Sequence, residues 1–188
     1  MIYFLYLIFS VSQKPSVMID NSIYKAAPPY YHPYFDLIQS NDLILELEKS
    51  KETTQKLFLS IKDENYAYAE NKWSIKEVLQ HIIDCERIYA YRALRFSRLD
   101  PTELAGFEEN DYISNIKPLQ NNLNDLLSEY QDVRNSTIKL FQPMTDKMLD
   151  FKGTANQFSL SARVLGFMTI GHNLHHCHSI ESRYLMKS

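Results

Sequence analysis

The sequence contains few of the residues that interrupt regular secondary structure. Only 4 Gly and 7 Pro occur among its 188 residues. An all-β domain needs a turn about every 8–12 residues, and this supply of turn-forming residues is too small for one. Long helices with few connections are therefore expected. The length suits a single domain with its own core, and an apolar fraction of 45% excludes a disordered or fibrous chain.

Cysteine and concentrated charge are scarce as well. Cys85 and Cys177 have neither CxxC spacing nor the density of a secreted disulfide scaffold, so we expect reduced thiols in a cytoplasmic protein. The formal net charge is −3, and Lys and Arg form no strong block, so binding to nucleic acid or to an anionic membrane is not expected. G-x-S-x-G, P-loop and dinucleotide fingerprints are absent, which argues against the common serine-hydrolase and nucleotide chemistries.

The first residues are unlike the rest of the chain. Met1–Val11 is almost wholly apolar, but it is too short to span a bilayer and lacks the positive segment and cleavage site of a signal peptide. Because a polar sequence follows Met18, we favour a misassigned start or an unstructured extension for residues 1–17. Export, membrane anchoring and packing on the domain remain alternatives.

Residues 1–39 are expected to precede the domain. In residues 19–39, three prolines stand among tyrosines and phenylalanines, which predicts an extended lead-in along the domain surface. Residues 40–188 then form the domain itself.

Four helical segments are expected within residues 40–188. The first covers about 42–62. The second covers about 74–98 and starts with the capping box Ser74-x-x-Glu77. The third begins near Pro118 and ends before Pro143, and the fourth covers about 161–186. These lengths predict an all-α, four-helix bundle, with a link at about 100–117 that is long enough for a crossover.

Histidine is concentrated near the end of the sequence. His172 and His176 are four residues apart, so they project side by side from one helix, as the two histidines of HExxH zinc sites do. Packing in the core and a solvated surface are the competing interpretations of such a pair. A mononuclear site also needs a third ligand. His81 is the better candidate because it lies within an apolar helix surface, whereas His32 is in the proline-rich lead-in.

Two segments resemble one known family. Trp73–Glu86 (WSIKEVLQHIIDCE) is similar to the second helix of the DinB-like (YfiT-like) superfamily, and Gly171–His176 (GHNLHH) is similar to its last helix. The resemblance covers about residues 40–187. It implies a four-helix bundle of up-down-down-up order whose three histidines, at the positions of His81, His172 and His176, bind one divalent metal ion per chain. Zinc or nickel is the usual metal in that superfamily.

The resemblance also implies a choice of activities. Superfamily members are described as metal-dependent hydrolases, and some branches are S-transferases that use small bacterial thiols. A metal ion held by neutral imidazoles would activate a bound water for hydrolysis or a bound thiol for transfer. The predicted partner is a small-molecule substrate, including a low-molecular-weight thiol, and a homodimer is plausible. A non-catalytic metal-binding or stress-associated bundle, and an interaction module without metal, are the alternatives.

Other polar residues near the histidines are candidates for supporting roles, and none is assigned as catalytic. His175 could orient a ligand or pack between helices, and Asp84 could orient His81, act as a base, or have only a surface or capping role. Glu86 follows closely, and Cys85 is within reach of His81 as a thiolate, although a buried reduced thiol is favoured. The acidic link at residues 106–112 is expected either to fold over the metal or to be a solvated connector.

Overall fold

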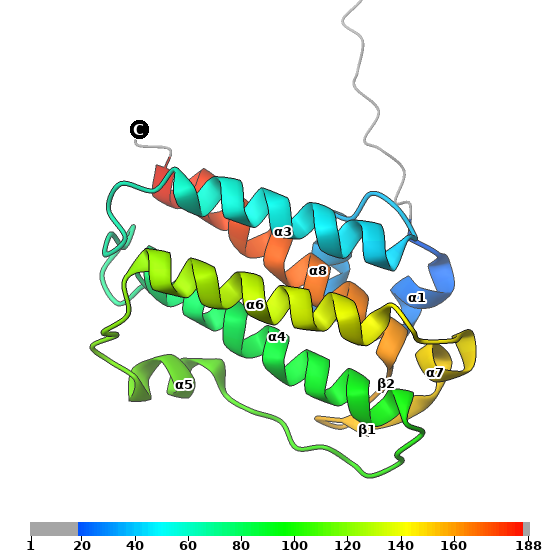
Figure 1. Ribbon diagram of the computed structural model, residues 1–188. Helices are drawn as coiled ribbons and strands as arrows, with labels where there is room; N and C mark the ends of the chain where they lie inside the picture. Colours follow the sequence, from blue (N-terminus) through cyan, green and yellow to red (C-terminus); the bar gives the residue numbers. More distant parts are fainter. Residues whose placement is uncertain (1–18, 186–188) are drawn as a thin grey trace, which may run out of the picture.

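The computed structural model describes residues 19–185 and is dominated by four long helices (Figure 1). The helices are α3 (Leu43–Leu59), α4 (Ile75–Ser97), α6 (Leu123–Phe141) and α8 (Ala162–Ser179). A π-helical stretch, η2 (Ile180–Leu185), continues α8. The predicted four-helix bundle is confirmed. The interpretations of residues 1–17 lie outside the described residues.

Polar caps determine where the long helices begin. The carboxylate of Asp42 accepts the N–H of Leu45 at 3.0 Å at the start of α3. The backbone N–H of Ser74 donates to Glu77 at 2.8 Å, which is one half of the predicted capping box. The start predicted for the third helix, Pro118, is wrong. That helix starts at Leu123, because the side chain of Asn122 caps it by accepting from the N–H of Asp125 at 3.0 Å.

One end of the bundle is tied by contacts between distant parts of the chain. The ammonium group of Lys76 donates to the carbonyl of Leu119 at 2.9 Å, so the approach to α6 lies beside the start of α4. The hydroxyl of Tyr184 donates to the carbonyl of Trp73 at 3.0 Å, so η2 ends there too. The link between α4 and α6 therefore runs back along the bundle, and it carries the short helix α5 (Glu109–Asn115) (Figure 1).

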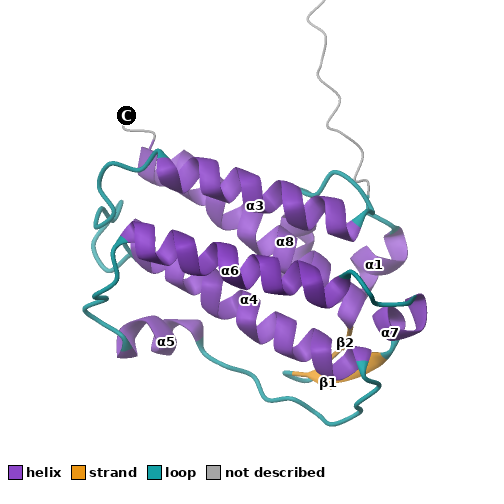
Figure 2. Cartoon of the chain, viewed as in Figure 1, coloured by secondary structure: helices purple, strands orange, loops and turns teal. Residues whose placement is uncertain are grey.

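A β-hairpin, which the sequence analysis did not foresee, lies at the opposite end (Figure 2). After the short helix α7 (Asp146–Asp150), β1 (Lys152–Ala155) pairs antiparallel with β2 (Phe158–Ser161). The two residues of the turn, Asn156 and Gln157, have φ values of 49° and 65°. Two positive φ angles in a two-residue loop match the twist of the strands, which is normally achieved with glycine. Because neither residue is glycine, no sequence signal marked this turn.

The lead-in packs on the bundle as expected, but it is not extended throughout. It forms α1 (Asn21–Ala26), the 3₁₀ turn η1 (Pro29–Tyr31) and α2 (His32–Phe35). Proline fits the first turn of a helix, so the prolines start these turns rather than preventing them. Phe35 is fully buried. A Cβ on Gly171 of α8 would lie 3.1 Å from the backbone of Tyr34, so the close approach of lead-in and α8 depends on that glycine.

A buried polar network joins the four long helices near their middle. Arg134 of α6 donates two hydrogen bonds of 2.8 Å to the carboxylate of Glu86 on α4. Its remaining donors reach the carbonyl of Leu47, the hydroxyl of Ser50 and the side chain of Asn173. The buried apolar residues of the described chain form two clusters. One includes Phe35 and Phe167, and the other includes Leu79 and Tyr130. Every charge in the polar network is paired, as burial requires.

Candidate metal centre

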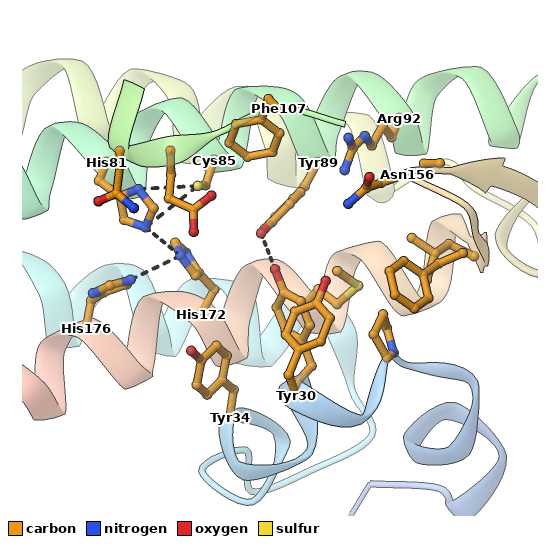
Figure 3. Close-up of a pocket in the computed structure, with 18 of the residues that line it drawn as sticks. Tyr30, Tyr34, His81, Cys85, Tyr89, Arg92, Phe107, Asn156, His172 and His176 are labelled. Atoms are coloured by element: carbon orange, nitrogen blue, oxygen red, sulfur yellow. Dashed lines mark hydrogen bonds between the residues drawn. The ribbon is translucent and has the colours of Figure 1, made fainter. Parts of the chain in front are cut away.

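Helices α4 and α8 bring together the three histidines that the sequence analysis selected (Figure 3). The Nε2 atom of His172 lies 2.9 Å from Nε2 of His81 and 3.1 Å from Nε2 of His176. One ligand atom from each ring lies within 4.8 Å of the others. A tetrahedral ion with bonds of about 2.0–2.1 Å to nitrogen separates its ligand atoms by roughly 3.3 Å. Small shifts of the rings would therefore admit such an ion.

Burial keeps these imidazoles neutral. Desolvation lowers the pKa of His81 to about 4. Desolvation also lowers the pKa of His172 well below its ordinary value, and the neighbouring His176 and His81 add to the effect. The pKa of His176 is likewise lowered well below the ordinary value, first by desolvation and then by His81 and His175. Neutral imidazole is the form that coordinates a metal ion, so the environment prepares all three rings as ligands.

The three histidines do not enclose a closed four-ligand site. They are the single group of three or more His, Cys, Asp or Glu ligand atoms with metal-binding spacing that residues 19–185 contain. Cys85 Sγ lies 3.7 Å from Nδ1 and 3.8 Å from Nε2 of His81, but it is not part of the group. Burial raises the pKa of the Cys85 thiol well above its ordinary range, which agrees with the favoured interpretation of a buried reduced thiol.

The histidine cluster, the candidate metal centre, opens into a cavity of about 340 Å³. Its walls come from α4, α8, the lead-in, the α4–α6 link and the hairpin, and they are rich in aromatic side chains. The lining residues outside the histidines include Tyr30, Tyr34, Tyr89, Arg92, Phe107, Glu109 and Asn156. Three-ligand sites that face a cavity are typical of catalytic metals, whereas structural zinc sites are closed by a fourth ligand.

The structure places the other polar residues near the histidines in different surroundings. His175 stacks on Tyr34 with a ring-centroid distance of 4.1 Å, and His178 is exposed. Asp84 accepts a hydrogen bond of 2.9 Å from Gln80 rather than orienting His81. Glu86 pairs with Arg134 in the core. Of these residues, His175 alone stays beside the centre, where its ring lies 5.2 Å from that of His176.

The acidic link at residues 106–112 lines the cavity, which agrees with the expectation that it folds over the histidines. Phe107, Glu109 and Asn110 are among the lining residues, although Glu109 itself is exposed. His32 lies outside the centre, stacked on Tyr24 with ring centroids 4.3 Å apart.

The sequence analysis did not predict the other polar residues that line the cavity. The hydroxyls of Tyr31 and Tyr89 share a short hydrogen bond, and the ring of Tyr89 lies 5.9 Å from that of His172. Tyr89 and Arg92 follow His81 by eight and eleven residues, which is the same helix face, so helical periodicity was the signal that could have found them. Tyr30 and Tyr34 gave no such signal, because their position depends on how the lead-in folds.

Comparison with known proteins agrees with this architecture. A model of the DinB superfamily matches residues 46–180, which include all three histidines. The chain belongs to the DinB superfamily. Among solved structures it is similar to YfiT from Bacillus subtilis, described as a probable metal-dependent hydrolase with an unusual four-helix bundle topology. The TM-score is 0.67 at 17% identity, over 78% of this chain and 87% of YfiT. A search of curated proteins gave no match.

The comparison with YfiT is evidence of fold alone, because the identity is low. Within residues 19–185, no helix of this DinB superfamily member has the length and apolarity needed to cross a membrane.

Proposed function

We propose that the protein is a mononuclear metal-dependent enzyme acting on a small molecule. His81, His172 and His176 hold one divalent ion, zinc or nickel, and the reaction is either hydrolysis or transfer of a small thiol. The convergence of three neutral imidazoles on an open cavity is the observation that supports this proposal most strongly. The description of YfiT as a probable metal-dependent hydrolase is consistent with it.

The chain supplies the groups that such chemistry requires. A divalent ion, when bound, provides a Lewis acid that makes a coordinated water or thiol ionise near neutral pH. The phenol of Tyr34 has a pKa raised by desolvation, and that of Tyr89 is raised further by burial and by Tyr31. Both phenols therefore stay protonated at neutral pH. Tyr34 can donate a hydrogen bond toward substrate, whereas the hydroxyl of Tyr89 is already bonded to that of Tyr31. Glu109, at the cavity wall, is an acceptor for a proton released there.

Metal content is the first test. We expect about one zinc or nickel per chain, by elemental mass spectrometry, in protein purified without a histidine tag. The double variant His172→Ala/His176→Ala should contain none. His178→Ala is the matched control, because it removes an exposed imidazole from the same helix and should leave the metal in place. No metal in the wild type after incubation with either ion would overturn the proposal.

The alternative is a non-catalytic metal-binding or stress-associated bundle. If the ion were structural, its removal would lower the melting temperature sharply, since the binding free energy would be part of the folding free energy. The structure favours the enzyme, because two hydrophobic clusters and a fully paired polar network hold the helices together independently of the histidines. A chelated protein that stays folded but loses turnover of model esters, or of a thiol and an electrophile, would support an enzyme and identify the reaction.

A further inference from the structure

Arg92 is a buried cation that lacks a carboxylate partner. Two arginines are buried in the described part of the chain, Arg92 and Arg134. Arg134 forms an ion pair with Glu86. In contrast, no carboxylate lies within 4.0 Å of the guanidinium of Arg92 in residues 19–185. Within the described residues, its guanidinium donates one hydrogen bond of 2.7 Å to the carbonyl of Ala105, and its Cζ lies 5.7 Å from the centre of the Phe107 ring. A guanidinium has five donors, and a buried charge is costly unless it is paired.

The unused donors of Arg92 face the cavity of the metal centre. Arg92 lines this cavity at the end away from the histidines, and Figure 3 shows its guanidinium directed into the space between Tyr89 and Asn156. Asn156, an exposed residue of the hairpin turn, also lines the cavity. The cavity thus has the histidines at one end, aromatic side chains in its middle and a cation with an amide beside it at the other end, and Glu109 is the one acidic side chain among its described lining residues.

Helix geometry sets the spacing of the two ends. His81 and Arg92 lie on the same face of α4 and are eleven residues apart, so their Cα atoms are separated by about 16 Å. Side chains on a helix lean toward its N-terminus, so the guanidinium leans toward His81 and shortens the gap. Figure 3 shows Tyr89 between them. A ligand that touches both ends is therefore an elongated small molecule.

We propose that Arg92, with Asn156 beside it, binds the carboxylate of the substrate or co-substrate while the other end of that molecule reacts at the metal centre. A carboxylate is favoured over a phosphate because Arg92 is the only Lys or Arg that lines the cavity within residues 19–185. One guanidinium matches one carboxylate through its paired N–H groups. Arg92 is a specificity-determining residue in this scheme. The inference rests on the proposed function, because it assigns the second end of the same cavity.

The test uses a probe that reaches both ends, 6-mercaptohexanoate, and its uncharged analogue 6-mercaptohexanamide. Affinities are measured by calorimetry on cobalt-loaded protein, and the thiolate-to-cobalt absorption band reports on the metal end independently. We expect the acid to bind at least about ten-fold more tightly than the amide, as for a hydrogen bond to a charged group. In Arg92→Gln this ratio should fall to about one while the absorption band of the amide complex is unchanged.

Control variants separate charge recognition from folding. Arg87→Gln removes an arginine of the same helix that pairs with Glu129, and it should keep the wild-type ratio. Arg92→Lys keeps the positive charge but lacks the paired N–H groups of a guanidinium, so it should retain part of the preference for the acid over the amide. An acid-to-amide ratio near one in the wild type, or the wild-type ratio in a folded Arg92→Gln, would overturn the proposal.

Failure of the metal site can be told apart from failure of this inference. If the protein binds no cobalt, the same comparison is made with hexanoate and hexanamide on the metal-free protein, where the histidines are neutral. A preference for hexanoate that disappears in Arg92→Gln would support the carboxylate site on its own, and no preference would refute it.

Discussion

At the scale of single residues, Asn173 links the core to the metal centre. It follows His172 directly on α8, and its side chain accepts a hydrogen bond of 3.0 Å from the hydroxyl of Tyr130. Its amide also donates to the hydroxyl of Thr54 on α3. Successive helix residues point about 100° apart, so fixing Asn173 against α3 and α6 fixes the rotation of α8. His172 is thereby held facing α4.

The Arg134–Glu86 pair gives a stability prediction. Arg134→Met would leave the carboxylate of Glu86, 2% exposed, without a partner. We expect the free energy of unfolding to fall by about 3–5 kcal/mol, measured by urea denaturation. Arg163→Met removes surface ion pairs with Asp146 and Asp150 and should cost about 1 kcal/mol or less.

A double variant separates the destabilisation caused by an unpaired buried charge from that caused by lost packing. The double change Glu86→Leu/Arg134→Met removes both charges and should recover much of the loss. Equal destabilisation by the single and double variants would mean that packing, not the unpaired charge, dominates.

The clustering of the three histidines could be predicted from the sequence, but most of the cavity could not. Spacing on a helix brings His172 and His176 together whatever the rest of the chain does, and the apolar surface around His81 marks a buried position. The side chains of Tyr30, Tyr34 and Asn156 reach the cavity through the lead-in and the hairpin. Their position follows from tertiary packing, which local patterns do not encode.

At the scale of elements, the hairpin is held against the end of α4. A Cβ on Gly153 of β1 would lie 2.2 Å from the ring of Phe96. Gly153→Ala should therefore lower the free energy of unfolding by about 1–3 kcal/mol in urea denaturation, because a rigid ring must move. Adding Phe96→Leu should relieve part of that loss, and an unchanged stability of Gly153→Ala would show that the hairpin is free to shift.

Capping chemistry explains which elements the sequence predicted well. The second helix starts where its S-x-x-E motif indicates, and the last starts after Ser161, whose side chain accepts from the N–H of Val164 at 3.3 Å. The third helix was placed too early because proline fits a first turn but does not compel one. The hairpin was missed because a turn made of Asn156 and Gln157 has no glycine to mark it.

At the scale of the whole molecule, the buried histidines make stability depend on pH. The pKa of His81 is about 4 in the folded chain and about 6.5 when unfolded, so between these values the unfolded chain binds more protons. Stability of the metal-free protein is therefore greatest above pH 6.5 and is lost as the pH falls toward 4.

The size of that loss can be measured. From pH 7 to 5.5, His81 alone should lower the free energy of unfolding by about 1 kcal/mol, and His172 and His176 add to this. Urea denaturation of chelated protein at both pH values checks it, with His81→Leu expected to show the smaller change. A stability that does not change with pH in the wild type would contradict the burial of these rings.

The division of the chain around the cavity has a consequence for how activities can diverge. The superfamily match covers residues 46–180 and so contains the three histidines, Tyr89 and Arg92. Tyr30, Tyr31 and Tyr34 precede it and form another wall. A change confined to the lead-in can therefore reshape the cavity without touching the metal ligands. The superfamily match therefore covers the histidine cluster but not this wall, and ligand screens for this protein are best guided by Tyr30, Tyr31 and Tyr34.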